Sequence, residues 1–315
     1  MSTTTENRQP PNSSSSLKAV VGRHPVAAFL VMVYTITWII FLPVVLQGRG
    51  LLALPIELSE GLAFNTVVAI ASILGVALPA FLVSAATGGK AGVRDLLGRC
   101  LRWRVGVRWY LLALFGLLIA MLLGASVFLG LAPLGALVKK WPLFFTLFLP
   151  EVLFPFVFIQ VFEETGWTGF MQHTLQERHG PLLASILVAP AFILMHLPPL
   201  LMDSDVGFAL LIIIGALVIV AVFFRIVIMW LYNGSGRSVL IVALFHSAYN
   251  SATSLGEQKF TGELISGPAL LYAVGALVVL AVLVVFFTRG HLAYEPERAG
   301  PRAAEAGGAA AQPRV

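Results

Sequence analysis

The chain has 315 residues, of which 58% are apolar and only 11% are charged, and its formal net charge is +5. Soluble domains average about 45–50% apolar and about 25% charged residues, so this chain has too few charges to cover a soluble surface. The composition excludes a soluble globular enzyme and a disordered protein, and the single cysteine, Cys100, excludes a disulfide-bonded scaffold. We expect a polytopic membrane protein whose excess of Lys and Arg sets its topology and does not bind nucleic acid.

In chain order, a polar and serine-rich segment comes first, and we expect residues 1–22 to form a disordered tail. Apolar stretches follow that approach the length of about 20 residues that a transmembrane helix needs. Eight such stretches occur: 26–46, 64–86, 109–132, 143–168, 181–200, 206–231, 238–256 and 267–288. The remainder, 289–315, is rich in Ala, Gly, Pro and Arg and is expected to be disordered. The sequence therefore predicts an all-α integral membrane protein with about eight transmembrane helices in one membrane domain, 23–288.

The basic residues indicate an orientation for these helices. If the N-terminus is cytoplasmic, fifteen of the twenty Lys and Arg residues lie on the cytoplasmic side and four on the other. Cytoplasmic loops of membrane proteins carry such an excess. We therefore expect both termini in the cytoplasm and a multi-pass protein of the cell membrane. The segment 99–108 interleaves Arg with Trp and is typical of an anchor at the membrane interface.

Polar side chains inside the predicted helices are the candidates for function, because charges at membrane depth are costly. They fall in the fourth to the seventh of the predicted helices. In chain order these residues are Glu163, Glu164, His196, Arg225, His246 and Asn250.

The spacing of these residues predicts how they face one another. His246 and Asn250 are four residues apart and share one helix face. Phe192 and His196 have the same separation, so the phenylalanine can wall a pocket or set the angle of the imidazole. Adjacent carboxylates point roughly 100° apart on a helix with about 3.6 residues per turn. We expect one of Glu163 and Glu164 to face the site and the other to face a supporting partner, such as an arginine.

A carboxylate, two histidines and an amide in a dry pocket are typical of a hydrolase. The carboxylate can deprotonate water, and a histidine can orient that water or protonate the leaving amine. A His-Asn pair can donate hydrogen bonds to an oxyanion. The set Glu163, His196 and His246 also has the ligand number of a catalytic zinc site with one open position. The sequence leaves the metal-free and the zinc version open, although it lacks the His-Glu-x-x-His pattern.

Each of these residues also has a structural explanation. An isolated histidine in a membrane helix is more often a packing residue than a catalyst. Glu163 and Glu164 could lie in water at the inner interface, and Arg225 could extend to the cytosol. The ordered occurrence of three polar sets on three helices favours a site over these explanations.

With these residues, the sequence resembles the CPBP intramembrane proteases, which include type II CAAX prenyl endopeptidases and Abi proteins. The resemblance covers about residues 90–255. It rests on three elements of this sequence: Glu163-Glu164-Thr-Gly-Trp-Thr168, Phe192-x-x-x-His196 and His246-x-x-x-Asn250. The resemblance implies an eight-helix core with a site that opens toward the cytosolic leaflet.

The resemblance also implies roles for these residues. Glu163 would be the general base for a water molecule, assisted by His196. His246 and Asn250 would stabilise the oxyanion, and Glu164 would support the site. Members of the family are described both as metalloproteases and as metal-free glutamate proteases, so zinc stays one of two alternatives.

One position departs from the family pattern. Thr168 stands where the motif has an arginine. If that arginine pairs with a glutamate, this chain must supply another cation or protonate the carboxylate. Arg225 is the candidate replacement by residue type.

The sequence therefore predicts an intramembrane endopeptidase in the lipid bilayer that cleaves a peptide or membrane-protein substrate near the cytosolic leaflet. One alternative is a non-catalytic immunity or scaffold protein that binds a peptide. Thr168 favours this alternative because it departs from the arginine of the protease motif. Another is a transporter with a proton-coupled Glu/His relay, for which the sequence shows no paired repeat.

Overall fold

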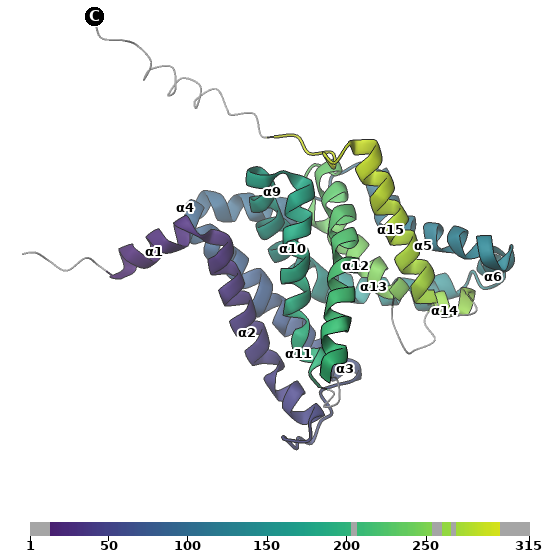
Figure 1. Cartoon of the computed structure of the whole chain (residues 1–315), viewed down its shortest axis with the longest axis horizontal. Coiled ribbons are helices and arrows are strands. Elements are labelled where there is room, and N and C mark those ends of the chain that lie inside the picture. The colour runs from purple at the N-terminus through teal and green to yellow at the C-terminus, as the bar shows by residue number, and fades with distance from the viewer. Residues whose placement is uncertain (1–12, 203–206, 254–259, 266–268, 297–315) are drawn as a thin grey trace, which may run out of the picture.

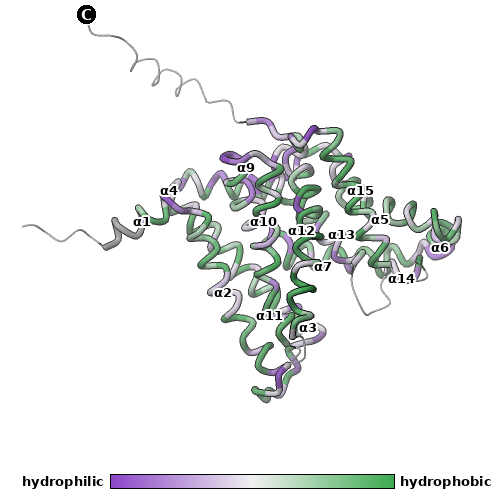
Figure 2. The backbone as a smooth tube through the Cα atoms, viewed as in Figure 1, coloured by the Kyte–Doolittle hydropathy of each residue, from purple (hydrophilic) through white to green (hydrophobic). Residues whose placement is uncertain are grey.

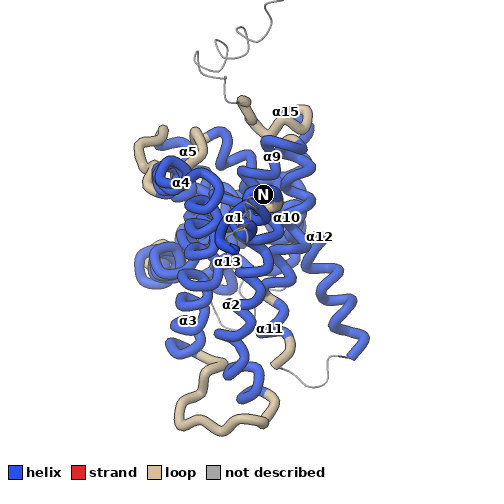
Figure 3. The backbone as a smooth tube through the Cα atoms, turned by 90° about the vertical axis from the view of Figure 1, so that its left-hand side faces the viewer, coloured by secondary structure: helices blue, strands red, loops and turns tan. Residues whose placement is uncertain are grey.

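The computed structural model describes residues 13–202, 207–253, 260–265 and 269–296 (Figure 1). Within these ranges every regular element is a helix and no strand occurs, as Figure 3 shows. The all-α class predicted from the composition is confirmed. This is the expected architecture in lipid, where a helix satisfies its own backbone hydrogen bonds.

The helices follow one another through the whole described chain, and several of them contain π-helical turns, labelled η. In chain order they are α1 (Ser13–Arg23), α2 (Pro25–Gly48), α3 (Gly61–Ile70), η1 (Ala71–Ala77), α4 (Leu78–Cys100), α5 (Val107–Leu129), α6 (Ala132–Lys139), η2 (Phe144–Phe148), α7 (Leu149–Pro155), η3 (Phe156–Gln160), α8 (Val161–Glu164), η4 (Thr165–Gln172), α9 (His173–His179), α10 (Pro181–Met195), α11 (Leu197–Leu200), α12 (Gly207–Gly234), α13 (Val239–Thr253), α14 (Phe260–Leu264) and α15 (Ala269–Thr288).

Each of the eight predicted stretches is mainly helical over the residues that the structure describes. Among the described residues, six helical runs are long and apolar enough to cross a membrane: Pro25–Gly48, Gly61–Cys100, Val107–Leu129, Phe144–His179, Gly207–Gly234 and Ala269–Thr288. The other two stretches form shorter apolar helices, α10 and α13. A multi-pass membrane protein is thus confirmed, whereas the count of eight crossings and the side of the termini stay predictions.

The outer surface of the bundle is apolar. Large side chains such as Val127 and Phe128 are each 78% exposed, and Phe286 is 73% exposed. Figure 2 shows hydrophobic residues along most helices and hydrophilic residues at their ends, notably at α9. Exposed apolar area on this scale indicates contact with lipid tails.

The helical run Phe144–His179 carries both glutamates and extends eleven residues beyond the predicted end at Thr168. The prediction ended early because the residues after Glu164 are mixed in polarity. In the structure they are packed inside the bundle, and Trp167 and Gln172 are fully buried. The π-helical turn η3 begins directly after Pro155, a residue that cannot donate a backbone hydrogen bond.

Gly166 permits a close approach between this run and η1. A Cβ atom at Gly166 would lie 2.5 Å from Val76 Cγ1 and 3.0 Å from the Val76 carbonyl oxygen. Only a residue without a side chain fits this contact. The contact brings η1, with Ser72, against the helix that carries Glu163.

In the basic segment 99–108, for which the sequence predicts an interface anchor, arginine and tryptophan side chains are in contact. The guanidinium carbons of Arg104 and Arg108 each lie 5.1 Å from the ring centres of Trp103 and Trp109, respectively. Trp103 is 61% exposed, as expected for a residue at the lipid headgroups.

The described parts of the two predicted tails are more ordered than expected. Residues 13–22 belong to α1, which packs against α2 and α4, and this contact explains a helix where low apolar content predicted disorder. After α15 the chain forms turns, and the carbonyl of buried Leu292 accepts a hydrogen bond from Asn233 Nδ2 at 3.1 Å. The rest of the predicted tails, 1–12 and 297–315, lies outside the described residues.

Candidate active site

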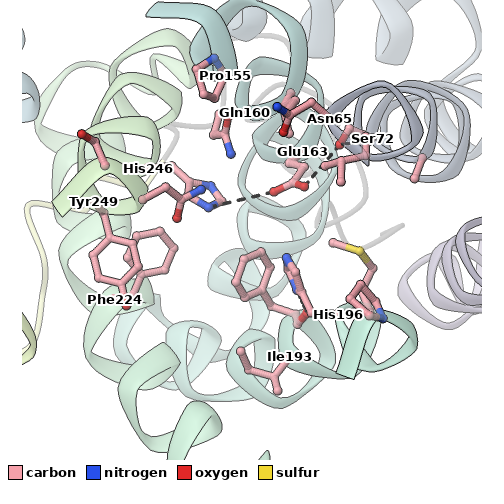
Figure 4. Close-up of a pocket in the computed structure, with 18 of the residues that line it drawn as sticks. Asn65, Ser72, Pro155, Gln160, Glu163, Ile193, His196, Phe224, His246 and Tyr249 are labelled. Carbon is pink, nitrogen blue, oxygen red and sulfur yellow. Dashed lines mark hydrogen bonds and ion pairs between the residues drawn. The ribbon is translucent and has the colours of Figure 1, made fainter. Parts of the chain in front are cut away.

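A cavity of about 800 Å³ lies within the bundle and contains most of the predicted site residues (Figure 4). Glu163, His196, His246 and Asn250 line it, together with largely apolar side chains from α2, α3, α7, α10, α11 and α12. Four of the five predicted catalytic residues therefore meet around one space, although they come from three separate helical runs. The fifth, Glu164, lies behind this wall.

Glu163 faces the cavity. Its side chain is only 6% exposed, and Ser72 Oγ lies 3.2 Å from Glu163 Oε1. The same hydroxyl lies 2.8 Å from the Val68 carbonyl, so its single hydrogen can serve either acceptor. On the other side, His246 Nε2 lies 4.0 Å from Glu163 Oε2, and Figure 4 shows the two side chains facing each other. Glu163 is thus held by one weak donor and has room for a water molecule.

Glu164 is fully buried and turned away from the cavity. Arg225 Nη1 donates to Glu164 Oε2 at 2.9 Å, and the Thr168 hydroxyl donates to the same oxygen. His246 Nδ1 lies 2.8 Å from Glu164 Oε1. The expectation that one carboxylate faces a site and the other a supporting arginine is confirmed. The alternative in which both glutamates lie in water at the interface is wrong.

Arg225 supplies the cation that the motif position lacks. Its side chain is fully buried, so the alternative in which it extends to the cytosol is wrong. Its guanidinium carbon lies 4.1 Å from the ring centre of Phe192, which adds a cation–π contact to the ion pair. Arg225 Nη1 also lies 3.3 Å from Thr168 Oγ1. Thr168 and Arg225 thus both bind Glu164 Oε2, so Glu164 has a cationic partner although the motif position holds a threonine.

Phe192 connects three functional side chains. Its ring centre lies 4.6 Å from that of His196 and 5.8 Å from that of His246, and Arg225 covers one face. Phe192 also lines the cavity. The ring therefore both walls the pocket and fixes the imidazole angles, the two roles that its spacing from His196 suggested.

The hydrogen bonds fix how each imidazole meets the cavity. His196 Nδ1 lies 2.8 Å from the Phe192 carbonyl oxygen. Because a carbonyl only accepts, Nδ1 carries the hydrogen and Nε2 of a neutral His196 is left as an acceptor. By the same reasoning His246 Nδ1 donates to the Glu164 carboxylate and presents Nε2 toward Glu163. Both rings therefore turn Nε2 to the pocket.

Sequence reasoning assigned no role to several polar residues on the cavity wall, among them Ser72 and Glu151. Ser72 lies in a predicted helix, where a single serine is too common to signal function. Glu151 accepts a hydrogen bond from Ser251 Oγ at 2.8 Å, and both residues line the cavity. Glu151 lies on the same cavity wall as Ser251 because α7 packs against α13, and residue spacing along the chain does not predict this packing.

A second buried polar cluster contains His173, to which the sequence assigned no role. Arg99 Nη1 lies 2.6 Å from His173 Nε2, and the Tyr232 hydroxyl lies 3.3 Å from His173 Nδ1. None of these residues lines the cavity. The cluster ties the end of α4 to α9 and α12 and has a structural explanation.

The donor geometry does not fit the zinc alternative. Among the described residues, no group of three or more His, Cys, Asp or Glu side chains is arranged to hold a metal ion. The set Glu163, His196 and His246 does not form such a group, and His246 Nδ1 is engaged by Glu164. The arrangement therefore supports no metal-dependent step, and the metal content of the purified protein is the direct measurement.

Comparison with known proteins identifies the family of this segment. Residues 144–252, about a third of the chain, match the family model described as type II CAAX prenyl endopeptidase Rce1-like. No curated protein matched the chain. The matched segment contains all five predicted site residues and Arg225, and it confirms the relationship to the CPBP and CAAX protease family that the motifs indicated.

Proposed function

We propose that the chain is an intramembrane endopeptidase in which Glu163 activates water for attack on a peptide bond. The single observation that supports this most directly is the position of Glu163. It is a nearly buried carboxylate on a cavity wall, beside His246 and on the same cavity as His196. The family match supports protease activity at the level of the class.

In the first step, water bound at Glu163 gives a proton to the carboxylate while its oxygen attacks the carbonyl carbon of the substrate. His196 Nε2, an acceptor in the neutral ring, can orient this water by accepting its second hydrogen. The attack forms a tetrahedral intermediate with a negative oxygen. The largely apolar lining of the cavity lowers the local dielectric, which strengthens each of these interactions.

In the second step, the carbon–nitrogen bond breaks and the leaving amine takes the proton that Glu163 received. The Asn250 amide is a donor for the oxyanion, and His246 Nε2 is a second donor when the ring is in its imidazolium form. Glu164 acts as a positioning residue, because its carboxylate fixes His246 Nδ1 and leaves Nε2 for the cavity. Arg225 in turn holds Glu164.

The test is peptide cleavage by the purified full chain. The probes are a mixture of fluorescence-quenched apolar peptides and a farnesylated CAAX peptide, incubated with wild type and Glu163→Gln. A general base typically contributes about 10²–10⁴-fold, so Glu163→Gln should lose activity by that factor. Glu177→Gln is the matched control, because Glu177 lies on the same helical run but outside the cavity. Equal cleavage by wild type and Glu163→Gln would refute the proposal.

Metal content is measured on the same purified sample, with and without a chelator. Activity that persists in a metal-free sample supports the glutamate mechanism. Loss of activity that zinc restores supports the zinc alternative with Glu163, His196 and His246 as ligands.

The alternative of a non-catalytic peptide-binding protein rested on Thr168. Because Arg225 pairs with Glu164 at 2.9 Å, the missing motif arginine no longer favours that alternative. A binding protein would retain its cellular effect in Glu163→Gln, whereas a protease would lose it.

A further inference from the structure

The residues that line the cavity lie toward one end of the helix bundle. In the run Phe144–His179 the lining residues end at Glu163, and in α12 they all precede Arg225. In α13 they begin at His246 and continue to Ser251. The residues that follow Glu163, such as Trp167, are packed and close the cavity from the opposite end.

The remaining walls come from the same ends of their helices. Phe41 lies in the second half of α2, and Phe64 and Asn65 lie at the start of α3. Leu200 is the last residue of α11. We call this end, which carries α11, the start of α3 and the loop 49–60, the mouth end (Figure 1).

The basic residues gather at the other end. Among the described residues outside the buried site, three Lys and Arg residues lie at helix ends on the mouth side: Arg49, Lys139 and Lys140. Eleven lie on the opposite side: Lys18, Arg23, Lys90, Arg94, Arg99, Arg102, Arg104, Arg108, Arg178, Arg237 and Arg289. By the positive-inside rule, the mouth end faces away from the cytoplasm.

Two expectations from the sequence therefore conflict in this structure. The distribution of charge places the basic end in the cytoplasm, whereas the family resemblance implies a site that opens to the cytosolic leaflet. We propose that the site receives its substrate from the non-cytoplasmic leaflet, as an internal segment of a membrane-anchored peptide or protein. This inference rests on the proposed protease function and names its substrate class.

The chemistry of the wall agrees with an internal segment. Among the described residues that line the cavity there is no Lys or Arg, whereas Glu151 and Glu163 are both acidic. Arg225 lies behind the wall and is paired with Glu164. A free C-terminal carboxylate would meet two acidic side chains and, among these described lining residues, no Lys or Arg. A largely apolar internal segment avoids this repulsion and matches the apolar majority of the lining residues.

Cysteine labelling tests the orientation without a substrate. In a Cys100→Ser background, which removes the single native thiol, Asn65→Cys places a thiol at the exposed edge of the cavity. Lys90→Cys is the matched reporter at the basic end, and Ala53→Cys on the loop 49–60 is a second mouth-end reporter if Asn65→Cys does not fold. The probe is a membrane-impermeant maleimide applied to sealed right-side-out vesicles.

We expect Asn65→Cys and Ala53→Cys to be labelled in sealed vesicles and Lys90→Cys to be labelled only after permeabilisation. The reverse pattern, with Lys90→Cys labelled in sealed vesicles, overturns the inference. This outcome leaves the proposed function untouched, because it reports orientation alone.

A pair of reporters then tests the substrate side. The same apolar peptide segment is placed on the non-cytoplasmic or the cytoplasmic side of a single anchor helix and is coexpressed with wild type or Glu163→Gln. We expect cleavage of the non-cytoplasmic reporter, with loss of that cleavage in Glu163→Gln. Glu163-dependent cleavage of only the cytoplasmic reporter overturns the inference but supports the protease function. Cleavage that does not depend on Glu163 refutes the protease function instead.

Discussion

Glu163 and Glu164 are adjacent in the chain, but they lie in opposite environments. Glu164 is fully buried, and its charge is matched by Arg225 and by hydrogen bonds from Thr168 and His246. Glu163 lies on a cavity wall with one weak hydroxyl donor from Ser72. A buried carboxylate without a partner is costly, so Glu164 is suited to a fixed charge and Glu163 to proton transfer.

The comparison shows how one helix turn can hold a reactive group and its support. Successive side chains of a helix diverge by roughly 100°, so the backbone that positions Glu163 also directs Glu164 into the ion pair. His246 joins the two regions, with Nδ1 on Glu164 and Nε2 toward Glu163. Loss of Glu164 should therefore change the site indirectly, and loss of Glu163 should change it directly.

The largest effect is expected from substitution of the two glutamates, one of which should change activity and the other stability. Glu163→Gln should lower peptide turnover by about 10²–10⁴-fold because the general base is lost, with little change in thermal unfolding. Glu164→Gln should lower the thermal midpoint because Arg225 loses its buried partner. Turnover and thermal unfolding are measured on the same detergent-purified samples. A stability loss in Glu163→Gln that exceeds the loss in Glu164→Gln would break the comparison.

Removal of the cation from the Glu164 region is expected to be the next largest effect. Arg225→Met leaves a buried carboxylate unpaired, and such a change typically costs about 3–5 kcal/mol of unfolding free energy. The change is measured by denaturant or thermal unfolding in detergent.

The matched rescue of this variant is Thr168→Arg in the Arg225→Met background, which returns an arginine to the motif position. Recovery of stability would show that Glu164 needs a cation and not Arg225 in particular. A double variant no more stable than Arg225→Met would contradict the interpretation of Arg225 as the replacement.

The third effect concerns the contact that brings Ser72 to Glu163. Gly166→Ala places a methyl group against Val76, and overpacking of this kind typically costs about 1–3 kcal/mol. Gly124→Ala in α5 is the matched control, because its Cβ meets no atom within 4 Å. The control should keep or raise stability, since alanine favours helix over glycine. Equal thermal midpoints for the two variants would show that the approach of η1 is not tight.

The smallest effect is expected at the single donor to Glu163. Ser72→Ala removes one hydrogen bond, typically worth about 1 kcal/mol, from a residue that also bonds its own helix. We expect a change in turnover of less than about tenfold, because 1.36 kcal/mol corresponds to a factor of ten. The readout is the turnover rate of Ser72→Ala beside that of wild type. A loss as large as that of Glu163→Gln would mean that Ser72 itself contacts the reacting atoms.

Much of the candidate site could be predicted from residue identity and spacing. Glu163, His196, His246 and Asn250 stand out because so few polar residues interrupt the apolar stretches, and all four line one cavity. Ser72 could not be found in this way, because its role depends on the approach of η1 at Gly166. The ends of the helices were predicted less well, as the burial of the polar residues after Glu164 shows.

The sequence by itself determined the membrane class, through a composition that cannot cover a soluble surface, and the divergence of two adjacent glutamates, through helix geometry. Only the tertiary structure decided which glutamate faces the cavity, which cation pairs with the other, and toward which end of the bundle the cavity lies. The reason is physical: Glu164 and Arg225 are 61 residues apart, and their contact depends on how whole helices pack. Local periodicity specifies a helix and its faces, but it does not specify the neighbour that each face meets.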